Sequence, residues 1–198
     1  MTGWVASKVR PAGRSGVHVF LILTSFIVIH PSKVSADGWV GEMNAAVLRE
    51  AWDYNIRDED AAMVTGGLFY RWSRHWATGI ELAAIGVHQE QVPSVVAGGF
   101  SLIVRWQRTC GRGRCFADAG GGLSYASDQV PEDGTRFNYL AQSAVGVSRP
   151  WSERAQLTYA LVWLHISNNG LAGRSRNPDI QALGARVGVS VALWGNPR

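Results

Sequence analysis

Between residues 39 and 194, apolar and polar side chains alternate with a period of two, in stretches separated by polar or glycine-rich breaks. Alternation of this kind is typical of strands, and its repetition in segments of about ten residues is typical of outer-membrane barrels. A closed bacterial barrel has an even number of strands. We therefore predict an all-β fold, an eight-stranded antiparallel transmembrane outer-membrane β-barrel. The predicted strands are 39–50, 62–73, 76–88, 96–108, 114–126, 136–149, 154–168 and 180–194.

The last predicted strand indicates which face lines the lumen. Its odd-numbered positions from Leu183 to Leu193 are all apolar, whereas its even-numbered positions are small or, at Arg186, charged. An arginine in mid-strand faces lipid only at a large free-energy cost, so we predict that the even face is internal. A soluble β-sandwich or lipocalin-like barrel would also alternate, but with apolar side chains inside and charges outside.

The same assignment places three acidic and three basic residues inside the barrel. Side chains fill an eight-stranded barrel, so we expect these charges to pair with one another rather than to conduct ions. Tryptophans near the predicted strand ends are expected to form interfacial girdles. The internal charges are Glu42, Arg71, Glu81, Arg105, Asp118 and Arg186.

Residues 1–36 have the composition of a signal peptide. Basic residues precede an apolar run from Val17 to Ile29, and the small-residue motif Val34-Ser35-Ala36 follows. The run is short for a membrane span, although an uncleaved anchor is the alternative. We predict a signal peptide over 1–36 and a barrel domain over 37–198. Four of the 19 basic residues and none of the 15 acidic ones precede residue 37, so the barrel carries balanced charge and no basic surface for nucleic acid.

The only two cysteines, Cys110 and Cys115, bracket the sequence Gly-Arg-Gly-Arg. In an exported chain we expect such a pair to form a disulfide across a turn, with free thiols as the alternative. A zinc site would need further ligands nearby, which this stretch lacks.

The stretch His165-Ile166-Ser167-Asn168 ends the seventh predicted strand. His165 and Ser167 are two residues apart and project from one face, where an imidazole can take the proton of the hydroxyl. With both chain ends in the periplasm, this strand runs outward, so the pair lies at the outer leaflet, which holds lipopolysaccharide. The same face continues through apolar and aromatic residues that must face lipid, namely Trp163, Leu161, Tyr159 and Leu157.

This motif, followed by a glycine-containing loop, Asn177 and a final strand, resembles the lipid A 3-O-deacylase (PagL) family of outer-membrane enzymes. The motif covers about residues 159–190, and the rest agrees in signal peptide, length and strand number. The resemblance implies a serine esterase in the cell outer membrane that hydrolyses the ester-linked 3-O-acyl chain of lipid A. Its substrate is then lipopolysaccharide, and it needs no cofactor and no metal.

Carried over residue by residue, the resemblance makes Ser167 the nucleophile and His165 the general base. It assigns Asn168 and the region of Gly170 as donors to the oxyanion. The third member is Asp179 when the motif is counted from the serine, or Gln181 when it is aligned on the asparagine of the loop. Chemistry favours the carboxylate, because a glutamine stabilises an imidazolium less.

Two other functions remain open from the sequence. The chain can be a non-catalytic surface or structural barrel whose outward loops carry the function. Alternatively, the same site can act on another ester, as an outer-membrane phospholipase or acyltransferase. The sequence also leaves a homodimer open, because lipid-facing apolar strands look alike whether they contact lipid or a second barrel.

Overall fold

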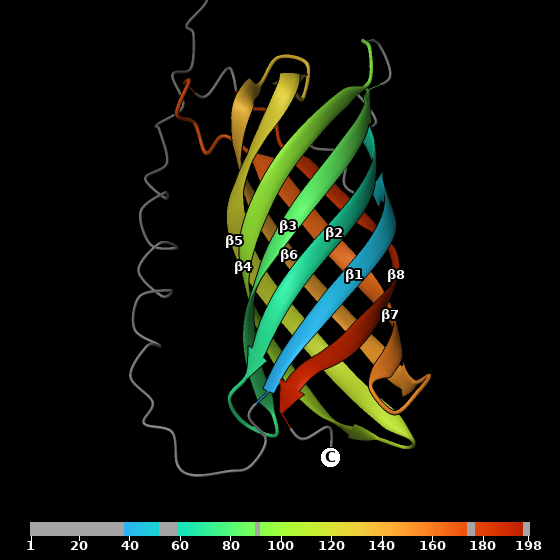
Figure 1. Cartoon of the computed structure of the whole chain (residues 1–198). Coiled ribbons are helices and arrows are strands. Elements are labelled where there is room, and N and C mark those ends of the chain that lie inside the picture. The colour runs from blue at the N-terminus through green and yellow to red at the C-terminus, as the bar shows by residue number, and fades with distance from the viewer. Residues whose placement is uncertain (1–37, 52–58, 90–91, 174–176, 196–198) are drawn as a thin grey trace, which may run out of the picture. The chain divides into compact units, whose positions relative to one another are not determined.

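The computed structural model describes residues 38–51, 59–89, 92–173 and 177–195, which form a closed barrel of antiparallel strands (Figure 1). Each strand pairs with its neighbours in sequence, and β1 pairs with β8 to close the barrel. The predicted fold class is confirmed. In the described part of the chain, no helix is long and apolar enough to cross a membrane. The strands are β1 (Gly38–Glu50), β2 (Glu59–Arg71), β3 (Trp76–Gln89), β4 (Val95–Cys110), β5 (Gly113–Val130), β6 (Thr135–Pro150), β7 (Ala155–Ser167) and β8 (Ile180–Gly195).

All eight predicted strands are present, and their ends differ by a few residues. The largest difference is in β5, which continues to Val130 instead of ending at residue 126. After a register shift, this extension pairs again at Thr135 of β6. The predicted signal peptide, residues 1–36, lies outside the described residues and stays a prediction.

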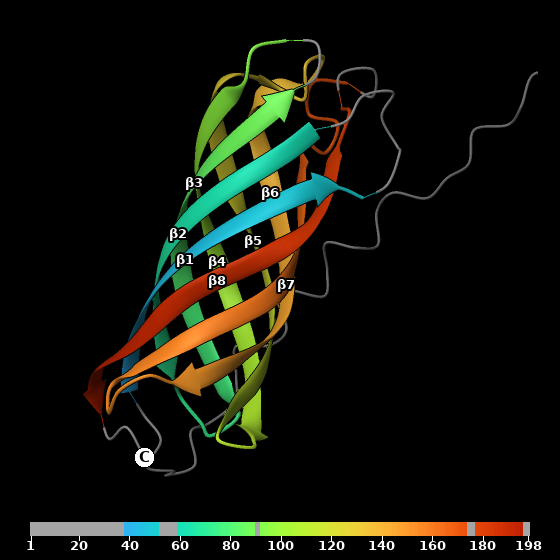
Figure 2. The same cartoon turned by 90° about the vertical axis from the view of Figure 1, so that its right-hand side faces the viewer.

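The two faces of the strands lie as the alternation predicts. In β8, Arg186 and Ser190 are buried, whereas Leu183 and Val187 on the opposite face are exposed. The view in Figure 2 shows β8 beside β1, whose residues alternate in the same way. An exposed apolar surface on a closed barrel is the arrangement that hydrocarbon requires.

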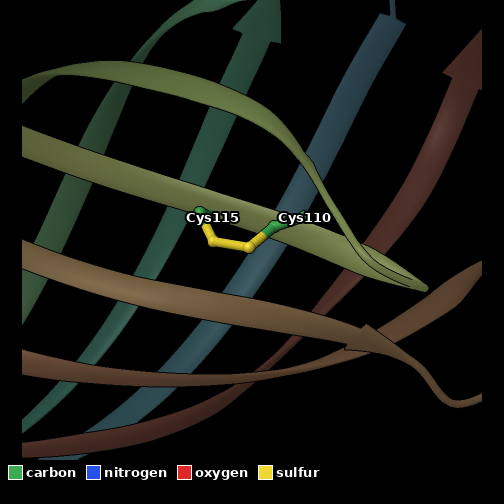
Figure 3. Close-up of a disulfide and its surroundings, with 2 residues drawn as sticks. All are labelled: Cys110 and Cys115. Atoms are coloured by element: carbon green, nitrogen blue, oxygen red, sulfur yellow. A yellow bond between two sulfur atoms is a disulfide. The ribbon is translucent and has the colours of Figure 1, made fainter.

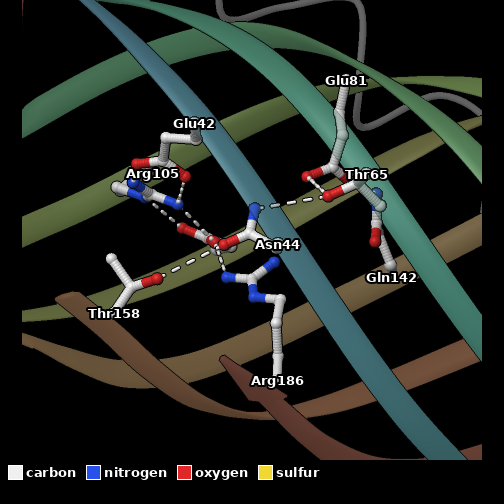
Figure 4. A network of polar contacts seen from close by, with 9 residues as sticks. Glu42, Asn44, Thr65, Glu81, Arg105, Gln142, Thr158 and Arg186 are labelled. Atoms are coloured by element: carbon white, nitrogen blue, oxygen red, sulfur yellow. Dashed lines mark hydrogen bonds and ion pairs between the residues drawn. The ribbon is translucent and has the colours of Figure 1, made fainter. Parts of the chain in front are cut away.

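The half of the lumen near the start of β1 and the end of β8 is filled by paired charges, which Figure 4 shows from close by. The Arg105 guanidinium donates to Asp118 at 2.7 and 2.9 Å and also donates to both carboxylate oxygens of Glu42. Arg186 donates to Asp118 at 2.8 Å. Arg71, Glu42 and Arg105 all line one small cavity of about 60 Å³. The predicted internal pairing of charges is therefore confirmed at its centre.

A chain of neutral and acidic side chains continues the polar filling across the lumen. Glu81 accepts hydrogen bonds from Thr65 and from Gln142, both at 3.0 Å. Asn44 donates to the Thr65 hydroxyl and accepts from Thr158, both at 3.3 Å. These bonds link five strands across the lumen, so the space is occupied by side chains that satisfy one another.

The other half of the lumen contains an apolar layer, which the alternation did not predict, beside buried polar side chains such as Glu59 and Asn138. Because side chains fill this space, they can be apolar and pack against one another, as in a soluble core. This packing also explains why the alternation is weakest near the end of β7, where both faces are largely apolar. The buried apolar side chains of this layer include Leu48, Met63, Ile85, Val87, Leu164, Ile166 and Ile180.

We predict that Arg105→Met destabilises the barrel by about 3–5 kcal/mol, because it leaves the carboxylate of Glu42 buried without its paired guanidinium. Urea unfolding in detergent, followed by circular dichroism, measures the change. The control Arg49→Gln removes an exposed pair with Asp60, whose charged atoms are 3.7 Å apart, and should cost less than about 1 kcal/mol. Equal stability of the two variants would contradict a structural role for the internal network.

Candidate functional site

The candidate residues lie where β7 ends and β8 begins, at the end of the barrel opposite to the start of β1. His165 pairs in register with Gln181, and Ser167 pairs with Tyr139 of β6. Odd-numbered side chains of β7 and β8 point away from the lumen, as the exposed Leu161 shows. His165, Ser167 and Gln181 therefore lie on the outward side of their strands, where Ser167 is itself buried.

The apolar layer of the lumen supports these residues from the inside. Leu164 and Ile166, which flank His165 along β7, are 1% and 2% exposed. Ile180 and Ala182, which flank Gln181 along β8, are fully buried. Because these neighbours are tightly packed, the backbone of β7 and β8 at His165 and Gln181 has little freedom to move.

Both candidates for the third member of the site lie beside the histidine. Nδ1 of His165 is 3.5 Å from Oδ2 of Asp179, an ion-pair contact that is longer than a good hydrogen bond. Nε2 of Gln181 donates to the same Oδ2 atom at 3.0 Å. The carboxylate thus stands nearest to the imidazole, and the glutamine holds the carboxylate.

A tryptophan that the sequence placed only among lipid-facing residues contacts the site. The rings of Trp163 and His165 are stacked, with their centroids 5.9 Å apart and their planes 10° from parallel. The spacing of two residues along one strand puts both rings on the same face but does not specify that they stack. Stacking limits rotation of the imidazole about its side-chain bonds.

The chain leaves β7 through a tight turn that begins at Asn168. Oδ1 of Asn168 accepts a hydrogen bond from the backbone N–H of Gly170 at 2.9 Å, and its carbonyl accepts from Leu171 at 3.1 Å. Asn169 and Gly170 have φ angles of 53° and 75°, in the left-handed region that asparagine and glycine tolerate best. The structure therefore gives Asn168 and Gly170 a role in forming the turn, and the N–H expected to bind an oxyanion is already bonded.

Ser167 lies next to this turn and is 7% exposed. Within the described part of the chain, its hydroxyl makes no hydrogen bond, including to His165. Catalytic hydrogen bonds are often long or poorly aligned in unliganded enzymes and tighten when substrate binds. The structure thus brings His165, Asp179 and Gln181 into contact, with Ser167 two residues further along the same face.

The two cysteines lie at the other end of the barrel. Cys110 and Cys115 form a disulfide that joins the end of β4 to the start of β5 (Figure 3). It stands apart from the histidine and serine, so it belongs to the turn and not to the site. Among the described residues, no group of three or more histidine, cysteine, aspartate or glutamate side chains is arranged to hold a metal ion.

A closed eight-stranded barrel with an apolar exterior is the architecture of outer-membrane proteins. The family model of lipid A 3-O-deacylase (PagL) matches residues 61–190, and the chain therefore belongs to the lipid A 3-O-deacylase (PagL) family. No curated protein sequence matches the chain.

Three solved structures share the fold at low sequence identity. The outer-membrane enzyme PagL has a TM-score of 0.54 and 12% identity, over 77% of this chain and 99% of that one. Neisserial surface protein A has a TM-score of 0.56 and 11% identity, over 79% and 97%. OprG from Pseudomonas aeruginosa has a TM-score of 0.50 and 10% identity, over 79% and 96%. These likenesses agree with a Gram-negative outer-membrane barrel and give no support for a homodimer.

We predict that Asn168→Ala loosens the turn, because it removes the side-chain acceptor of the Gly170 N–H. A hydrogen bond contributes about 1 kcal/mol, so the amide of Gly170 should exchange with solvent about fivefold faster. Asn169→Gly is the matched control. Glycine adopts the left-handed conformation at position 169 readily, and this variant keeps the side chain of Asn168 as the acceptor. Unchanged exchange in Asn168→Ala would show that other contacts hold the turn.

Proposed function

We propose that this barrel is an outer-membrane serine esterase that hydrolyses the ester-linked 3-O-acyl chain of lipid A. The observation that carries the proposal is the contact between Asp179 and His165 on the outer face of the barrel, on the strand surface that also bears Ser167. Membership of the lipid A 3-O-deacylase family supports the choice of substrate. A lumen filled with side chains supports a site on the exterior, since a lipid cannot enter the barrel.

The lengths of the connections support one orientation of the barrel. At the end where β1 begins and β8 ends, the connections are the short segments 72–75, 111–112 and 151–154, and short connections are typical of the periplasmic side of such barrels. At the other end the β5–β6 connection, 131–134, is also short, but the β7–β8 connection spans residues 168–179. We therefore assign the start of β1 and the end of β8 to the periplasmic side and the site to the outer leaflet, where lipopolysaccharide lies.

The proposed reaction begins when Oγ of Ser167 attacks the ester carbonyl of lipid A. Nε2 of His165 takes the hydroxyl proton, while Asp179 beside Nδ1 stabilises the imidazolium and its tautomer. The tetrahedral intermediate collapses as His165 returns the proton to the leaving sugar oxygen. Water then hydrolyses the acyl-enzyme by the same route and frees the fatty acid.

Two neighbouring groups complete the proposed site. Gln181 positions the carboxylate of Asp179 through their 3.0 Å hydrogen bond. The turn from Asn168 to Gly170 supplies donors to the oxyanion, after the Gly170 N–H exchanges its present acceptor for the substrate oxygen. This exchange is a local rearrangement at the start of the connection to β8.

We predict that Ser167→Ala and His165→Ala each lower deacylation at least about a thousandfold, because either change removes the nucleophile or its base. Mass spectrometry of lipid A from cells that express each variant measures the fraction of lipid A that has lost the 3-O-acyl chain. Ser143→Ala is the matched control, because Ser143 lies beside Trp163 on the same outer face and outside the proposed site. It should leave activity unchanged.

The same experiment separates the rival functions. An unchanged lipid A acylation pattern with the wild-type barrel would favour a non-catalytic surface protein. Loss of acyl chains from phospholipids in place of lipid A would favour a phospholipase, and a newly acylated product would favour an acyltransferase. Each of these results would overturn the proposed substrate.

We predict that Asp179→Asn lowers kcat more than Gln181→Ala does. Loss of the carboxylate removes stabilisation of the imidazolium and costs up to about 10⁴-fold in related triads, whereas loss of Gln181 removes one hydrogen bond, worth about tenfold. Steady-state kinetics with purified lipid A measures both. A larger loss in Gln181→Ala would reassign the histidine's partner to the glutamine.

A further inference from the structure

Three exposed arginines gather at one corner of the periplasmic end, around the turn between β4 and β5. Arg108 is on β4 and Arg149 on β6, each on the outward face of its strand, and Arg112 is in the turn itself. In register, Arg108 lies opposite Cys115 of β5. We call these three residues the corner arginines.

The side chain of Arg149 lies across the turn. Its Cδ atom would be 3.2 Å from a Cβ atom placed on Gly113, and its Nη1 atom would be 3.7 Å from one placed on Gly111. Gly113 is required mainly by the backbone, since its added Cβ would overlap the carbonyl oxygen of Ser148, and the two Arg149 distances show only that this side chain lies close to the turn. The disulfide between Cys110 and Cys115 ties the same turn together (Figure 3). One arginine of the corner therefore lies beside a covalently closed turn.

The charges of the corner arginines are not neutralised by the described residues. The guanidinium groups of the three make no ion pair or hydrogen bond with a described group. Arg105 and Arg186, by contrast, both bind Asp118 inside the lumen. Neighbouring guanidinium groups repel one another, so an external anion that binds between them would relieve the repulsion.

Aromatic residues fix the depth of this corner in the membrane. Trp106 precedes Arg108 by two residues on the same face of β4, and Trp151 follows Arg149 in the next turn; their exposed fractions are 37% and 67%. Exposed tryptophans mark the membrane–water interface. Two residues along a strand span about 7 Å, so the guanidinium groups reach the layer of phosphate head groups.

We infer that the corner arginines bind the phosphodiester head group of an anionic phospholipid, of the phosphatidylglycerol type, in the inner leaflet of the outer membrane. This inference rests on the orientation given under Proposed function and is independent of the esterase chemistry. A guanidinium binds phosphate oxygens through two parallel hydrogen bonds. No carboxylate of the described residues pairs with the cluster to receive an ammonium, so a zwitterionic head group fits less well.

Native mass spectrometry of the purified barrel in detergent, titrated with phosphatidylglycerol or phosphatidylethanolamine, tests the site. The wild-type barrel should bind phosphatidylglycerol more tightly than phosphatidylethanolamine. An arginine near anionic lipid contributes about fivefold in affinity, so Arg108→Gln combined with Arg149→Gln should weaken phosphatidylglycerol binding roughly 25-fold. Equal affinity of the wild type for the two lipids would overturn the inference.

The matched control is Arg74→Gln, because Arg74 is exposed in the β2–β3 turn at the same end. It should change binding by less than about twofold, since it lies outside the corner. If it weakens binding by about fivefold, the share expected of each arginine in the double variant, the charges act as a diffuse field and the site does not exist. Circular dichroism checks that each variant keeps its strands.

Two further variants separate this inference from the proposed function. Replacement of both arginines by lysine keeps the charge but loses the bidentate geometry, so it should recover only part of the lost affinity. Ser167→Ala should bind phosphatidylglycerol like the wild type, and the double glutamine variant should keep full deacylase activity. A wild-type barrel that binds phosphatidylglycerol selectively but does not deacylate lipid A would reject only the proposed function. One that deacylates lipid A but does not bind phosphatidylglycerol selectively would reject only the lipid site.

Discussion

Closure of the barrel by pairing β1 with β8 is the constraint on which the rest of the molecule depends. The two strands pair from Gly38 to Glu50 of β1, so no edge of the sheet is left open. Hydrocarbon offers no hydrogen-bond partners, and only a closed sheet pairs the backbone N–H and C=O groups of every strand. Once the sheet is closed, each strand has one face toward lipid and one toward the lumen. The alternation of side chains and the place of the site both follow from this.

The filled lumen determines where chemistry can occur. The half near the start of β1 is held by the charges around Arg105, and the half that carries the candidate site is held by an apolar layer. Neither half leaves room for a lipid. His165 and Ser167 therefore act, in the proposed function, from the outside of a strand whose inward residues Leu164 and Ile166 are packed. The layer that supports the site is the same one that stabilises the outer end of the barrel, which links stability to the geometry of the imidazole.

The fold could be predicted from the sequence because its signal is local. Eight alternating stretches and the inward arginine at position 186 specify strands and their faces. The apolar layer in the lumen could not be predicted in this way, because a buried apolar face inside a barrel and a lipid-facing apolar face have the same composition. The site was predictable as far as the shared face of His165 and Ser167. The stacking of Trp163 on His165 and the bonded state of Gly170 depend on side-chain conformations that spacing does not specify.

The sequence by itself determined the barrel class, the side of each strand that meets lipid, and the family motif. Each of these depends only on the order of residues within single strands. It could not choose between Asp179 and Gln181, because residues two apart lie on the same face of a strand and a shift of two residues changes no pattern. Only the tertiary structure decided their arrangement. The register of β7 against β8 sets Gln181 opposite His165, and the entry of the chain into β8 brings the carboxylate of Asp179 between them, where it contacts both.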